Sequence, residues 1–212
     1  MFLIYVLQFF YISILSTFLH FSYDLTNHVF IFSIIGAVNE STWEHLKIGI
    51  FPWFTWFMIR SYFFSYIGSF FSNFIAIITF MSTITFIFYG SIFILKKHVL
   101  PISISSFYIG VFIGMLFEYL TINIYYPILE LIGAIGCISI IIIGLMWTYH
   151  PLKFFLTQDT RYRRYGIEAH GKRCDILARK KYIVYIFNKF GIPLDNNSPN
   201  DEIRLPKYMD IK

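Results

Sequence analysis

Five long apolar runs constrain this chain more than any other feature of its sequence. They cover residues 2–21, 47–66, 70–89, 101–121 and 127–149, and each is close to the ~20 residues that a helix needs to cross the hydrocarbon of a bilayer. Only 14% of the residues are charged and 57% are hydrophobic, so the chain is far more apolar than a soluble globular domain. The sequence therefore predicts an all-α, polytopic membrane helix bundle over residues 1–151, with the lipid bilayer as its first partner.

The connections between these runs also carry information. The first run lacks a positively charged start and a small-residue cleavage site, so we expect it to be retained as a span. The apolar stretch 29–38 is too short to cross. It is expected to lie in the membrane interface, or to dip in and return, and to deliver residues 39–47 to the membrane edge. Pro52 is expected to kink the second span.

Residues 39–47 crowd polar, ionisable and aromatic side chains between two apolar runs. Ser41 and Glu44 have the spacing of a capping box, in which the Ser41 hydroxyl accepts from the Glu44 N–H and the Glu44 carboxylate accepts from the Ser41 N–H. The carboxylate also sits favourably at the positive end of the helix dipole. On this interpretation the segment is a capped entry into the second span, and Asn39, Ser41 and Trp43 have structural roles.

A second interpretation gives the same segment a functional site. Glu40 and Glu44 lie four residues apart, and two ionised carboxylates at that spacing repel unless a cation or a proton compensates. Carboxylates with imidazoles can bind a divalent metal or relay protons. The candidate metal ligands are His20, Glu40, Glu44 and His45, and the candidate catalytic residues are Glu40, Glu44 and His45. Since no recognised metal motif accompanies them, no cofactor is predicted, and a divalent metal stays an open alternative.

Two groups of residues resemble a family of small multi-pass membrane proteins of unknown function. The first group is Leu19-His20-Phe21 and Tyr23, Val38-Asn39-Glu40-Ser41, Trp43-Glu44-His45-Leu46-Lys47 and Phe51-Pro52. The second is Gln158-Asp159 with Tyr165-Gly166-Ile167, where Thr160 replaces the expected proline and three arginines intervene. The resemblance covers residues 1–167 and implies a five-span membrane fold, but it implies no activity.

Arg60 lies deep in the second expected span and Glu118 lies near the far end of the fourth. A charge there is costly unless it is paired or reaches the headgroups. At ~1.5 Å per residue, both side chains fall at a similar depth if their helices start on the same side. We therefore expect a structural ion pair between Arg60 and Glu118.

The positive charge of the chain is concentrated in residues 152–212, a basic tail in which thirteen Lys/Arg stand against seven Asp/Glu. With five spans, this tail shares one side with Lys96 and Lys97, and the positive-inside rule assigns that side to the cytoplasm. The N-terminus is then outside or lumenal. Residues 172–190 are typical of a basic helix that lies on anionic lipid headgroups or packs on its own loops, and residues 192–212 are expected to be loose.

Two classes of function follow from these features. The favoured one is a multi-pass integral membrane protein with a structural or accessory role and no catalysis. The alternative is a membrane-embedded enzyme, or a carrier of ions or small solutes, that uses Glu40, Glu44 and His45. Nucleic-acid binding is not expected, because the tail does not resemble a dedicated basic domain. The sequence does not determine an oligomeric state.

Overall fold

The computed structural model describes residues 2–63, 69–95, 99–159 and 165–167, and the chain is all-helical over these residues. The six helices are α1 (Phe2–Leu25), α2 (Phe30–Ile35), α3 (Thr42–Phe63), α4 (Phe70–Leu95), α5 (Leu100–Thr121) and α6 (Pro127–Tyr149). The predicted helical bundle is thus confirmed. Most of the expected basic tail lies outside the described residues.

Four of the helices are long and apolar enough to cross a membrane, namely α1, α4, α5 and α6. The second expected span, 47–66, is different. Its helix α3 begins five residues earlier, at Thr42, and is not one of these four apolar helices. The reason is that α3 carries Glu44, Lys47 and Arg60, and all three side chains are buried. Among the described residues the bundle therefore contains four strongly apolar helices and, with them, the more polar α3.

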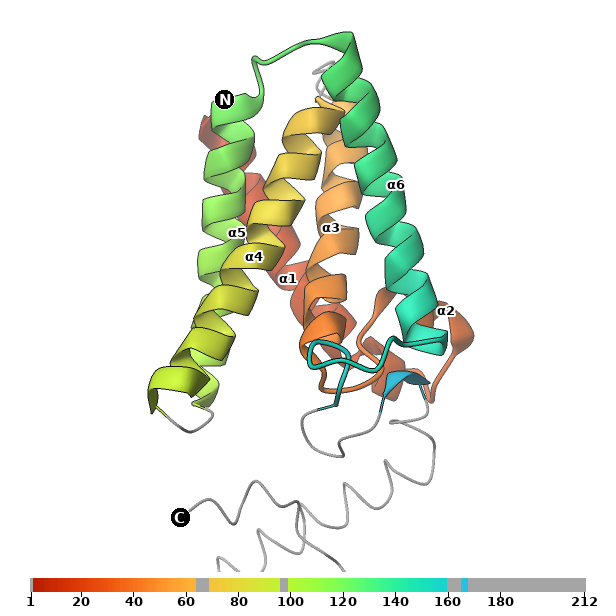
Figure 1. Ribbon diagram of the computed structural model, residues 1–212. Coiled ribbons are helices and arrows are strands. Elements are labelled where there is room, and N and C mark those ends of the chain that lie inside the picture. The colour runs from red at the N-terminus through yellow and green to blue at the C-terminus, as the bar shows by residue number, and fades with distance from the viewer. Residues whose placement is uncertain (1, 64–68, 96–98, 160–164, 168–212) are drawn as a thin grey trace, which may run out of the picture.

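Helix α3 lies in the middle of the bundle, between α6 on one side and α1 and α4 on the other (Figure 1). Its Trp53 is fully buried and packs on Phe80 of α4, with ring centroids 5.6 Å apart. The other long helices turn apolar side chains outward, for example Phe86, Phe112 and Ile128. Only 17–28% of their most apolar windows are buried. Such wide exposed apolar surface suits contact with lipid rather than with water.

Successive long helices run in opposite directions, so the bundle has two distinct ends (Figure 1). The N-terminus lies at one end with the end of α3, the start of α4 and the α5–α6 connection. Residues 26–41, the end of α4, the start of α5 and residues 150–159 lie at the other end, which we call the polar end. Stretch 29–38 forms the short helix α2 there, packed on α1, α3 and α6, and it does not cross the bundle.

Helices α4 and α6 cross closely near their N-termini. The Glu130 carboxylate of α6 accepts hydrogen bonds from the Phe70 N–H, at 2.7 Å, and from the Ser69 hydroxyl. One turn further along, Gly133 lies directly against the α4 backbone, and a Cβ at this position would be 2.4 Å from Phe71 N and 2.5 Å from Phe70 C. Small residues allow such close approach of helices in membranes.

Replacing Gly133 with alanine is expected to lower the free energy of unfolding by about 1–3 kcal/mol, because an added methyl group must push backbone rather than a side chain. Thermal melting in detergent measures this loss. The matched control is Gly90→Ala in α4, where an added Cβ meets nothing within 4 Å. That variant is expected to be neutral or slightly stabilised. Equal melting temperatures for the two variants would show that the α4 and α6 backbones are not in close contact at Gly133.

Candidate functional site

The expected cap of α3 is present in part. The Glu44 N–H donates to Ser41 Oγ at 3.3 Å, as the capping box predicts. The prediction of the reciprocal bond, from the Ser41 N–H to the Glu44 carboxylate, is wrong. The Ser41 N–H donates instead to Asn39 Oδ1 at 2.8 Å. The Glu44 carboxylate accepts from the Val38 N–H at 3.0 Å. Asn39 Oδ1 therefore accepts the hydrogen bond that was expected for the Glu44 carboxylate. The Glu44 carboxylate contacts other groups instead.

Those partners form a buried charge network at the polar end. Lys47 Nζ lies 2.6 Å from Glu44 Oε2 and donates to Ser33 O at 3.0 Å and to Thr148 Oγ1 at 2.8 Å. The Thr148 hydroxyl lies 3.1 Å from Glu44 Oε1. An ammonium group has three donors, and here each has an acceptor. Lys47 and Glu44 are both buried. The ion pair and these hydrogen bonds offset the free-energy cost of removing the two charges from water.

A segment after α6 closes over the start of α3. The Trp43 N–H donates to Leu156 O at 2.8 Å, the Glu40 N–H donates to Asp159 Oδ2 at 2.8 Å, and Asn39 Nδ2 donates to Gly166 O at 2.9 Å. The first N–H groups of a helix have no partner within the helix, and this segment supplies one for Trp43. Residues 39–43 thus form one hydrogen-bonded unit with residues 156–159 and Gly166.

Gly166 closes this unit for a conformational reason. Its φ is +61°, in the left-handed region that glycine adopts without steric cost. A Cβ there would lie 2.7 Å from Thr148 O and 2.9 Å from the Pro151 ring. Glycine is therefore required both by the backbone angle and by the close approach to the end of α6.

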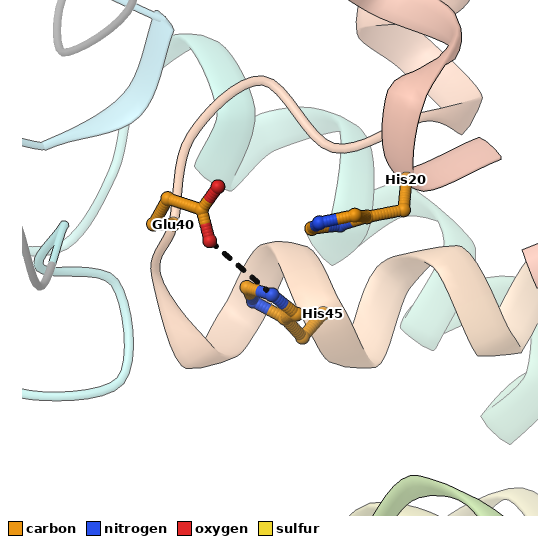
Figure 2. Close-up of side chains that lie close together, drawn as sticks. All are labelled: His20, Glu40 and His45. Carbon is orange, nitrogen blue, oxygen red and sulfur yellow. Dashed lines mark ion pairs between the residues drawn. The ribbon is translucent and has the colours of Figure 1, made fainter. Parts of the chain in front are cut away.

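Three further polar side chains meet beside this unit. His20 projects from α1, Glu40 from the loop before α3, and His45 from the first turns of α3 (Figure 2). His45 Nε2 lies 3.6 Å from Glu40 Oε2, and the rings of His20 and His45 have centroids 5.0 Å apart. One ligand atom from each residue lies within 4.8 Å of the other two. Glu44, the fourth metal candidate, is not part of this group.

The predicted ion pair between Arg60 and Glu118 is present. Arg60 Nη2 lies 2.5 Å from Glu118 Oε1, and both side chains are buried. The second carboxylate oxygen of Glu118 accepts from Gln8 Nε2 at 2.7 Å. The pair therefore links α3 to α5, and Gln8 adds α1 to the contact.

Comparison with known families identifies the chain's relatives. A family model described as a family of unknown function (DUF6512) matches residues 2–167. The chain belongs to that family. No curated protein and no solved structure matches it. The DUF6512 region contains all six described helices and ends at Ile167, directly after Gly166, so it includes the segment that closes over α3.

In this DUF6512 member the residues singled out from the sequence separate into four places. Asn39, Ser41 and Trp43 belong to the closed unit, His20, Glu40 and His45 form the cluster beside it, and Arg60 and Glu118 pair inside the bundle. Glu44 belongs to the buried network with Lys47. Sequence reasoning missed the parts played by Gln8, Thr148 and Asp159. For Gln8 and Thr148 the available signal was a lone polar side chain in or at the end of an apolar run.

Proposed function

We propose that this protein is a multi-pass integral membrane protein with a structural or accessory role, which holds its basic tail at one membrane face. The observation that carries the proposal is the closure of the polar end. Residues 39–43 are hydrogen-bonded to Leu156, Asp159 and Gly166, so the segment that leads from α6 into the tail is tied to the bundle. The polar residues of the 39–47 motif are largely engaged in internal contacts, which supports structure over catalysis.

The enzyme or carrier alternative relied on Glu40, Glu44 and His45 acting together. The Glu44 carboxylate is instead engaged by Lys47, Thr148 and the Val38 N–H. Since this carboxylate already has partners on both oxygens, it is poorly placed to take a substrate or transported ion. The geometry therefore favours the structural proposal for Glu44.

Orientation is the second part of the proposal. Helix α4 ends and α5 begins at the polar end, and α6 also ends there (Figure 1). In the sequence, Lys96 and Lys97 stand between α4 and α5, and the basic tail follows α6. The positive-inside rule would place this end in the cytoplasm and the N-terminus outside or in a lumen. Anionic lipid headgroups are then the natural partner of the tail, because each basic side chain near such a surface contributes about 1 kcal/mol.

Labelling of Cys174 tests the lipid partner, because this cysteine lies in the tail sequence while Cys137 is buried in the bundle. An environment-sensitive fluorophore on Cys174 is expected to shift its emission to the blue in nanodiscs that contain anionic lipid, relative to zwitterionic nanodiscs. The shift should fade at high salt, because salt screens surface charge. Fluorescence spectra of the full chain in the two lipids measure the effect.

Two charge reversals of equal size separate the tail's basic segment from its end. Lys180→Glu with Lys181→Glu changes residues 172–190 and is expected to abolish most of the shift. Arg204→Glu with Lys207→Glu changes the charge equally outside that segment and should leave most of the shift intact. Identical spectra in anionic and zwitterionic nanodiscs would exclude the lipid partner.

A further inference from the structure

We propose that His20, Glu40 and His45 bind a divalent transition-metal ion of the zinc type at the polar end of the bundle. Three protein ligands would hold the ion, and water would complete its coordination. This site is independent of the structural role proposed above. Two imidazoles and one carboxylate form a ligand set that Zn²⁺ and Fe²⁺ commonly take, with an open position left for water.

The spacing of the three side chains fits one ion. Ligand atoms around a tetrahedral zinc, at bond lengths of ~2.0–2.2 Å, lie about 3.3–3.6 Å from each other, and His45 Nε2 lies 3.6 Å from Glu40 Oε2. Imidazole rings on one such ion have centres about 5 Å apart, and the His20 and His45 centroids are 5.0 Å apart. The three ligand atoms lie within 4.8 Å of one another. The longest of these separations would have to shorten by about 1 Å when an ion binds, which side-chain rotation can supply.

The hydrogen bond of His45 determines which ring nitrogen is available to an ion. His45 Nδ1 lies 2.8 Å from Ser41 O, and a carbonyl oxygen only accepts, so Nδ1 carries the proton and donates it. In the neutral ring Nε2 then has the free lone pair. Metal-binding histidines are commonly oriented in this way, by donating the other ring N–H to a backbone carbonyl.

The arrangement also needs a positive charge between its members. The Nε2 lone pair of neutral His45 faces a carboxylate oxygen of Glu40, and two acceptors at this distance are stabilised by a cation or a proton between them. The two imidazole rings lie beside each other, with ring planes 41° apart. A divalent cation satisfies the carboxylate and both neutral rings together.

The backbone around the cluster is held in place, and the cluster remains open to solvent. The Glu40 N–H donates to Asp159 Oδ2, which ties the loop of Glu40 to the segment after α6. The side chains of His45 and Glu40 retain exposed fractions of 37% and 25%, so an ion can enter from the aqueous side. Ligands supplied from three different places, α1, a loop and α3, would be joined by the ion.

Zinc titration of the chelator-treated full chain in detergent tests this site. Competition with a fluorescent chelator is expected to show one Zn²⁺ per chain. Glu40→Gln, His45→Gln and His20→Gln are each expected to weaken binding at least about tenfold, because each removes one of three ligands. The matched control is His150→Gln, which removes an exposed histidine at the end of α6 and should leave the affinity unchanged.

Less than one zinc per chain, unchanged affinity in the three ligand variants, or equal weakening by His150→Gln would overturn the proposal. X-ray absorption of the zinc-loaded wild-type chain decides the question even if a variant fails to fold. The expected spectrum contains the scattering of two imidazoles and two oxygen ligands, one from Glu40 and one from water. A zinc coordinated without imidazole would also overturn the proposal.

Discussion

Replacing Arg60 with methionine is expected to lower the free energy of unfolding by about 3–5 kcal/mol, because it leaves the Glu118 carboxylate buried without its counter-charge. Both oxygens of Glu118 are engaged in the wild type, one by Arg60 at 2.5 Å and the other by Gln8 at 2.7 Å. Methionine keeps most of the side-chain volume, so the loss reports charge rather than a cavity. For a chain of this length, the melting temperature should fall by about 10 °C.

The double variant Arg60→Met with Glu118→Gln distinguishes a stranded charge from lost packing. The amide that Glu118→Gln introduces is neutral and retains an oxygen that can accept from Gln8, so the double variant is expected to recover most of the lost stability. Glu118→Gln alone strands the Arg60 guanidinium and should be nearly as unstable as Arg60→Met. A double variant no more stable than the two single variants would contradict the ion pair as the source of the effect.

The Arg60–Glu118 pair also shows what the sequence can predict about this fold. Long apolar runs specify where helices lie, because crossing the hydrocarbon requires a nearly fixed number of residues. Counting residues from a shared end then places two charges at similar depth, and α3 and α5 do start at the same end (Figure 1). The capping box at Ser41 also places the start of α3 at Thr42, where the helix does begin, although the apolar run that marks the expected span starts only at residue 47.

The polar contacts across the bundle were less accessible to sequence reasoning. Thr148 meets Glu44 and Lys47, which lie more than a hundred residues earlier in the chain, and no local pattern specifies such a pairing. Similarly, Ser41 and Glu44 were assigned to each other from their spacing alone. Asn39 takes the Ser41 N–H in the folded chain, because an Asn side chain reaches a backbone N–H two residues ahead.

Replacing Lys47 with methionine is the second substitution with a large expected effect, again about 3–5 kcal/mol. The Lys47 ammonium contacts Glu44 Oε2, Ser33 O and Thr148 Oγ1, so its removal leaves a buried carboxylate and a buried carbonyl without their donor. Ser33 belongs to α2 and Thr148 to α6, so the loss reaches beyond α3. Thermal melting measures the total effect, and amide hydrogen exchange of residues 30–41 should rise because α2 loses its link to α3.

Comparison with the Arg60 pair makes this prediction specific. Lys47→Met with Glu44→Gln removes both charges, but Ser33 O still lacks a donor, so this double variant should recover less stability than Arg60→Met with Glu118→Gln. An unpaired buried acceptor costs about 1–3 kcal/mol, which sets the expected shortfall. Lys153→Met makes the same chemical change at an exposed position and should alter stability by less than about 0.5 kcal/mol. Full recovery in the Lys47 double variant would show that the Lys47–Ser33 hydrogen bond contributes nothing, and that α2 is held by packing alone.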